Sequence, residues 1–250
     1  VAREVLSALE FFEAAGLPAF ADDWRALHAH EGRRLRVRLA KALYEDGRRN
    51  EAEGYLRQAL ELQPDLAEGH CNLGVILQAR AQLGEARRHY EEALRLDSTL
   101  VEAMAGLGVV LCRSQHAGQG LSLLERVVAL NPDGMLARHN LAVAYHQAGR
   151  LDQARAAFAA LLRADPHYPG ARQALAQVHY SQGLRYLQDD QPQEALLSFG
   201  QARDQGAQGE ELLFAEGLAN MRLRRYSQAE GAFKALLALQ ADHVPALRNL

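Results

Sequence analysis

The side chains that could carry out chemistry lie on two neighbouring stretches of the sequence. His139 and His146 are seven residues apart, so on a helix they share one face. We expect Cys112 on the adjacent helix beside His146, and Cys71 is the one further candidate for a four-ligand zinc site. A nucleophilic pair of Cys112 and His146 would instead require a contact of about 3 Å and an oxyanion site. Ordinary lining of a binding surface is the favoured interpretation of these side chains.

Motifs that support an enzyme are absent from the sequence. It has no Gly-x-x-x-x-Gly-Lys phosphate loop, no His-Glu-x-x-His and no Cys-x-x-Cys. The one basic cluster, residues 33–38, spreads its arginines around a helix, which predicts a solvated surface rather than a nucleic-acid or membrane contact. We therefore predict no catalytic residue, no metal site and no cofactor.

The composition is typical of a soluble globular protein. Of the 250 residues, 48% are hydrophobic and 24% are charged, and the net charge of −3 argues against a strongly basic nucleic-acid-binding protein. The sequence has no run of eighteen apolar residues, which predicts no membrane span, and its first residues do not match a signal peptide. Lys41 and Lys234 are the only lysines among many arginines, which indicates a GC-rich, bacterial genome. The compartment stays open between cytoplasm, which is favoured, and periplasm.

The sequence repeats with a period of 34 residues. Segments 69–74 and 137–142 are similar and lie two periods apart, with the related segment 104–108 between them. Proline or serine recurs once in each period, at Pro64, Ser98, Pro132 and Pro166. A period of this length is typical of supersecondary units that stack on one another.

The repeat resembles the tetratricopeptide repeat family, whose units combine large-x2-Leu-Gly-x2-Tyr with Ala-x3-Phe and a closing proline. In the unit 67–100, Leu73 and Gly74 carry the first motif, and Ala86 and Tyr90 carry the second. The resemblance implies an all-α fold, a right-handed superhelical solenoid of stacked antiparallel helix hairpins.

We predict a single solenoid over residues 1–250. Its parts are an N-terminal helical hairpin or cap at 1–32 and full units at 33–66, 67–100, 101–134, 135–168, 169–209 and 210–243. After residue 168 the pattern slips by seven residues, about two helical turns, so the fifth unit is expected to have a first helix lengthened over Pro169–Leu187. Residues 244–250 open another unit and stop, which indicates a piece of a longer chain.

The resemblance also implies a concave groove lined mainly by the first helix of each unit. The sixth positions of the first four units are Arg38, Asn72, Gly106 and Asn140. An asparagine amide offers a donor and an acceptor, so a row of them matches the backbone of an extended partner, as in some members of the family. Arg38 and Gly106 interrupt this row, and asparagines that are merely solvated are the equal alternative. The residues predicted to contact a partner are Arg38, Tyr44, Asn72, Gln78, Arg113, Asn140, His139 and His146.

Two classes of function are consistent with these residues. The first is a non-catalytic protein–protein interaction scaffold whose groove binds a protein or peptide segment, with no nucleic acid, no membrane insertion and an open oligomeric state. Val37, Cys71 and Glu102 stand where chaperone-tail-binding members carry polar or basic residues, which argues against that kind of adaptor. The alternative is the targeting or regulatory region of a larger enzyme, glycosyltransferase- or sulfotransferase-like, or of a bacterial polysaccharide-export assembly.

Overall fold

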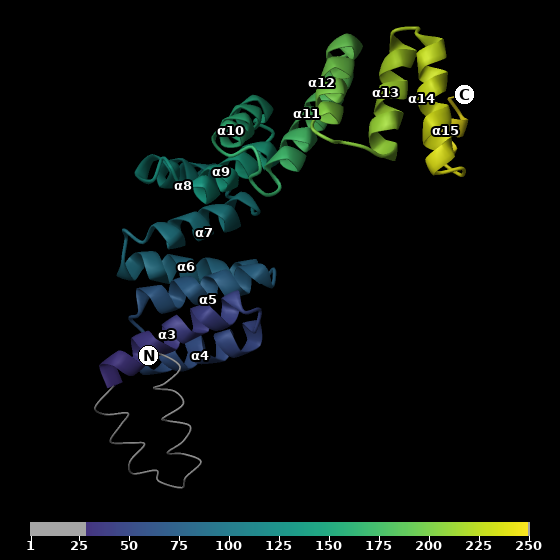
Figure 1. Ribbon diagram of the computed structural model, residues 1–250. Coiled ribbons are helices and arrows are strands. Elements are labelled where there is room, and N and C mark those ends of the chain that lie inside the picture. Colours follow the sequence, from purple (N-terminus) through teal and green to yellow (C-terminus); the bar gives the residue numbers. More distant parts are fainter. Residues whose placement is uncertain (1–28, 250) are drawn as a thin grey trace. The chain divides into compact units, whose positions relative to one another are not determined.

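The computed structural model describes residues 29–249, and every regular element in that range is an α-helix (Figure 1). The predicted all-α fold of stacked helix hairpins is therefore confirmed. Most of the N-terminal hairpin expected over residues 1–32 lies outside the described residues. Residues 29–32 belong to the first described helix, α3.

The described helices form hairpins, each made of a first and a second helix. The first helices are α3 (Ala29–Glu45), α5 (Ala67–Ala79), α7 (Val101–Cys112), α9 (Met135–Gln147), α11 (Ala171–Gln188) and α13 (Glu210–Arg222). The second helices are α4 (Arg49–Leu62), α6 (Leu83–Leu96), α8 (Ala117–Leu130), α10 (Leu151–Ala164), α12 (Pro192–Asp204) and α14 (Tyr226–Leu239). A short helix, α15 (Val244–Leu247), follows α14.

The helix starts reproduce the period of the sequence, with one interruption. Helices α5, α7 and α9 begin 34 residues apart, and so do α12 and α14. Helix α11 has 18 residues where α9 has 13, and the segment before it, 165–170, is two residues longer than the corresponding segment 131–134. The seven extra residues are thus shared between the helix and the turn that leads into it.

The described helices divide into two compact units, and the division falls between Val127 and Val128 within α8. In the first unit α3 packs against α4 and α5 against α6, and α4 and α6 each pack against the following first helix. Four of its fully buried large side chains are Leu56 on α4, Ile76 and Leu77 on α5, and Tyr90 on α6. This core holds the first helices at a fixed spacing.

The second unit repeats the same arrangement from α9 to α15. Each helix packs against the next one along the chain. Phe158, Phe199 and Phe233, one on each second helix, are completely buried in three successive clusters. Burying a side chain of this size stabilises a fold by roughly 1.5–3 kcal/mol relative to leaving it exposed, so these rings are main contributors to the stability of each hairpin.

Candidate binding surface

The first helices lie side by side within each unit and give it one continuous face. Helix α5 contacts both α3 and α7 in the first unit, and α11 contacts both α9 and α13 in the second (Figure 1). We call the solvent side of α3, α5 and α7, and separately that of α9, α11 and α13, the first-helix face of each unit. All eight residues predicted to contact a partner lie on first helices or, for Arg113, at the residue that caps α7.

In the first unit the predicted residues differ in how free their polar groups are. Arg38 on α3 and Arg113 are exposed. Tyr44 is half-buried, and the guanidinium carbon of Arg49 lies 5.8 Å from the centre of its ring. Gln78 accepts a hydrogen bond of 3.0 Å from the Tyr90 hydroxyl through its side-chain oxygen, which leaves its amide N–H groups for a partner.

Asn72 on α5 is a polar side chain of the first-helix face with unused hydrogen-bonding capacity. It is half-buried between the buried residues Cys71 and Leu73. Within residues 29–249 its amide makes no hydrogen bond to another side chain or to the backbone. Its amide therefore keeps a donor and an acceptor that are not used within the described residues.

Packing explains why a glycine, Gly106, interrupts the asparagine row, and the sequence did not reveal this explanation. A Cβ atom at Gly106 would lie 2.3 Å from Cζ and 2.7 Å from the hydroxyl of Tyr90, which reaches it from α6. The position that corresponds to Tyr90 one unit earlier is Leu56, a shorter side chain, and there the sixth position is Asn72. The size of the neighbouring core residue thus decides whether an asparagine fits.

In the second unit Asn140 on α9 is half-buried and, like Asn72, makes no side-chain hydrogen bond within the described residues. The adjacent His139 instead packs inward. Its ring centre lies 5.7 Å from that of Phe158 and 5.5 Å from that of Tyr168, and its buried Nδ1 has no hydrogen-bond partner in the described part of the chain. The Asn140 amide therefore has unused hydrogen-bonding capacity, whereas His139 is held against the hairpin core.

His146 connects two first helices of the second unit. Its Nε2 lies 2.9 Å from the hydroxyl of Ser181 on α11. Burial lowers the pKa of His146, so the ring is neutral at physiological pH. Once the seven-residue slip is counted, Ser181 occupies the sixth position of its unit, and its hydroxyl already has a partner within the fold.

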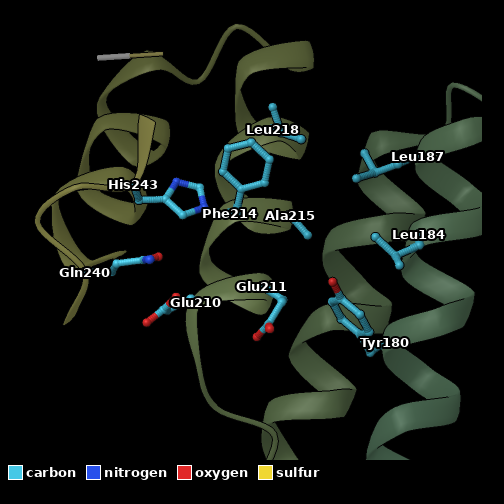
Figure 2. Close-up of a pocket in the computed structure, with 10 residues that line it drawn as sticks. All are labelled: Tyr180, Leu184, Leu187, Glu210, Glu211, Phe214, Ala215, Leu218, Gln240 and His243. Carbon is cyan, nitrogen blue, oxygen red and sulfur yellow. The ribbon is translucent and has the colours of Figure 1, made fainter. Parts of the chain in front are cut away.

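A pocket of about 360 Å³ lies on the first-helix face of the second unit, between α11, α13 and the segment that joins α14 to α15 (Figure 2). Its lining is mostly apolar and consists of Tyr180, Leu184, Leu187, Phe214, Ala215 and Leu218, with Glu210, Glu211, Gln240 and His243 at its edges. None of these was among the predicted residues. Once the seven-residue slip is counted, Leu184 and Leu218 occupy the same position of their units as Val75, Val109 and Val143. This shared position is the feature of the sequence from which the pocket could have been predicted.

The two cysteines do not have the environment of reactive thiols. Burial, with smaller contributions from the charges of Glu102 and Glu68, raises the pKa of Cys71 to about 12. Burial also raises the pKa of Cys112, whose Sγ lies 3.9 Å from the carbonyl oxygen of Ala117. Both thiols are protonated at neutral pH, whereas a nucleophilic or metal-binding cysteine needs a lowered pKa.

The described part of the chain holds neither a metal-binding cluster nor a membrane-spanning helix. No group of three or more His, Cys, Asp or Glu side chains with the geometry to hold a metal ion occurs in residues 29–249. None of the described helices has the length and apolar character needed to cross a membrane.

Stacked hairpins of 34 residues, with a continuous first-helix face in each unit, define a helical repeat protein of the scaffold class. Tetratricopeptide repeat models match residues 35–63, 67–100, 113–178 and 180–244. Together they span most of the sequence, and the chain belongs to the tetratricopeptide repeat family. Members of this family generally act as scaffolds for interactions between proteins. No curated protein matches the sequence.

Solved structures of the same fold include several bacterial proteins. YrrB, described as a tetratricopeptide repeat protein with an unusual peptide-binding site, is 25% identical with a TM-score of 0.57 over 73% of this chain and 90% of its own. Pseudomonas aeruginosa PilF is 20% identical, with a TM-score of 0.57 over 88% and 96%. The C-terminal part of a Cytophaga hutchinsonii repeat protein is 16% identical, with a TM-score of 0.62 over 98% of both chains.

Proposed function

We propose that this protein is a non-catalytic scaffold whose first-helix faces bind a segment of another protein. The observation that carries the proposal is the side-chain amide of Asn72, half-buried and unpaired within the described residues. Partial burial of a polar group costs free energy unless it is hydrogen-bonded, and an amide matches the C=O and N–H of a partner's backbone. Asn140 repeats the arrangement in the second unit.

Apolar side chains beside these amides support the same proposal. Val75 on α5 and Val143 on α9 are half-buried one turn after Asn72 and Asn140. A partner segment that hydrogen-bonds the amides would cover these valines, and the burial of apolar surface would add to its affinity. The similarity to YrrB, which has a peptide-binding site, favours a peptide segment as the partner.

The proposal is tested with a random peptide library displayed on phage and selected on the full chain. We expect selected peptides whose affinity falls at least about tenfold when Asn72→Ala and Asn140→Ala are combined, since each lost hydrogen bond is worth roughly 1 kcal/mol. The helical content and melting temperature should stay unchanged. Asn131→Ala, in the exposed turn before α9, is the matched control and should have no effect. Equal affinity in the double variant, or a library that yields no binding peptide, would overturn the proposal.

A further inference from the structure

We infer that the pocket on α11 and α13 selects partner segments in which a large aliphatic side chain stands next to a lysine or arginine. This inference rests on the proposed function, because it names the kind of partner that the first-helix face of the second unit accepts. It is carried by two features of the pocket, its apolar wall and the unpaired carboxylates at one end.

The apolar wall fits an aliphatic side chain. Leu184 and Leu187 on α11 face Phe214 and Leu218 on α13 across the pocket (Figure 2). Leu184, Phe214 and Leu218 are only half-buried, so an incoming side chain would remove more of their surface from water. The volume of about 360 Å³ lies at the lower end of the range of small-ligand pockets, about 300–1,000 Å³, and suits one or two side chains rather than a folded element.

The carboxylates set the charge of the occupant. Glu210 and Glu211 lie at the start of α13, at the end of the pocket away from Leu187 and Leu218 (Figure 2). Neither forms an ion pair within the described residues.

Three other carboxylates of the second unit are paired within the fold. Glu216 pairs with Arg203, Asp190 lies 3.4 Å from Arg222, and Glu230 lies 2.5 Å from Lys234. Two unpaired carboxylates at the same end of the pocket attract a cation, which an incoming lysine or arginine would supply.

The aromatic residue near Glu211 adds to this preference (Figure 2). Tyr180 stands close enough to Glu211 for that charge, after burial, to raise the pKa of its hydroxyl, so the phenol stays neutral. The ring of Phe214 lies 5.2 Å from the ring of His243, whose Nδ1 accepts a hydrogen bond from the backbone of Ala246. A lysine or arginine next to Glu211 would also be attracted to the ring of Tyr180 by cation–π interaction. An acidic segment would meet repulsion at the same place.

The inference is tested by fluorescence anisotropy with three short labelled peptides whose ends are blocked. The first carries Leu-Arg-Leu-Lys between Gly-Ser flanks, the second has glutamate in place of both basic residues, and the third has serine in place of both leucines. We expect the first to bind the full chain at least about tenfold more tightly than either of the others, and its affinity to fall with rising salt.

Variants of the chain assign the binding to the pocket. Glu210→Gln combined with Glu211→Gln should weaken the first peptide about fivefold and improve the second. Glu194→Gln with Asp204→Asn removes the same charge from exposed positions on α12 and should change nothing. Leu218→Ser should abolish binding of the first peptide, whereas Leu197→Ser, at an exposed leucine outside the pocket, should not.

Different failures lead to different conclusions. If library-selected peptides bind through Asn72 and Asn140 but the glutamine variants bind the first peptide as the parent does, the inference fails and the proposed function stands. If no peptide binds any variant, both fail. If the glutamine variants instead dissociate a dimer of the chain in light-scattering measurements, the occupant is a second copy and the inference is overturned.

Discussion

The imidazole rings of His70 on α5 and His89 on α6 form a pair in which their Nδ1 atoms lie 2.9 Å apart. The rings are stacked, with centres 5.2 Å apart. His70 donates from Nε2 to the carbonyl oxygen of Pro64 at 2.8 Å, so in the neutral ring its Nδ1 is an acceptor and His89 is the donor between them. The pair therefore joins α5, α6 and the turn at Pro64, with His89 as the donor between the two rings.

The burial of His89 predicts acid sensitivity. Burial, the nearby His70 and the positive charges of Arg57 and Arg88 lower the pKa of His89, against an opposing effect of Glu85. The unfolded chain, with a histidine pKa of about 6.5, therefore binds more protons than the folded chain in the window just below that value. The stability that His89 contributes is complete above about pH 6.5 and is lost as the pH falls through its lower folded pKa.

Melting curves between pH 7.5 and 5.5 check this prediction. Burial also lowers the pKa values of His139, His146 and His179, so we expect the melting temperature to fall over this interval. The fall should be smaller for His89→Gln than for the parent, whereas His167→Gln, at an exposed position, should behave as the parent does. An unchanged fall in His89→Gln would show that protonation of His89 is not coupled to unfolding.

The contact between Tyr90 and Gly106 predicts a rescue by a second substitution. Gly106→Asn would place an asparagine between Asn72 and Asn140 in the row but forces the new side chain against Tyr90, and overpacking of this kind costs about 1–3 kcal/mol of unfolding free energy. Tyr90→Leu combined with Gly106→Asn reproduces the pair of Leu56 and Asn72 and should recover part of that loss. Denaturant unfolding of the parent, the two single variants and the double variant measures the unfolding free energy of each. A double variant less stable than the sum of the two single losses would show that size matching does not govern this position.

Left-handed backbone in the hairpin turns predicts a gain in stability. Ala81 and Gly149 occupy corresponding positions after α5 and α9, with φ of 60° and 71°. This conformation costs a residue with a Cβ about 1–2 kcal/mol, whereas glycine adopts it freely but loses more entropy on folding. We expect Ala81→Gly to raise the unfolding free energy by about 0.5 kcal/mol and Gly149→Ala to lower it by about 1 kcal/mol. Changes of the opposite sign in calorimetry would contradict this explanation.

Much of the fold could be predicted from spacing alone, because each hairpin depends on local periodicity and on its nearest neighbours. The 34-residue period anticipated helices that start at Ala67, Val101 and Met135. The seven-residue slip after residue 168 was visible in the sequence as well. How the seven extra residues divide between α11 and the preceding turn was not. That division depends on where the turn at Gly170 ends and the helix begins, and sequence patterns fix such boundaries poorly.

The surface was harder to predict because side-chain partners come from other helices. Nothing in the sequence beside Gly106 indicates that Tyr90 fills its space, or that His139 meets Tyr168. The pocket at α11 and α13 escaped prediction because Glu210 and Glu211 lie on a helix whose motif is weak, and their lack of ion pairs within the described residues becomes visible only when their neighbours are placed.

The claim that the first-helix faces bind the partner is tested most directly by methyl NMR with a library-selected peptide. We expect the methyl signal of at least one of Val75, Val143, Leu184 and Leu218, all on first helices, to shift on addition of the peptide. The exposed leucines of the second helices, Leu62, Leu130, Leu197 and Leu239, should stay in place. Shifts confined to the second helices would contradict this claim.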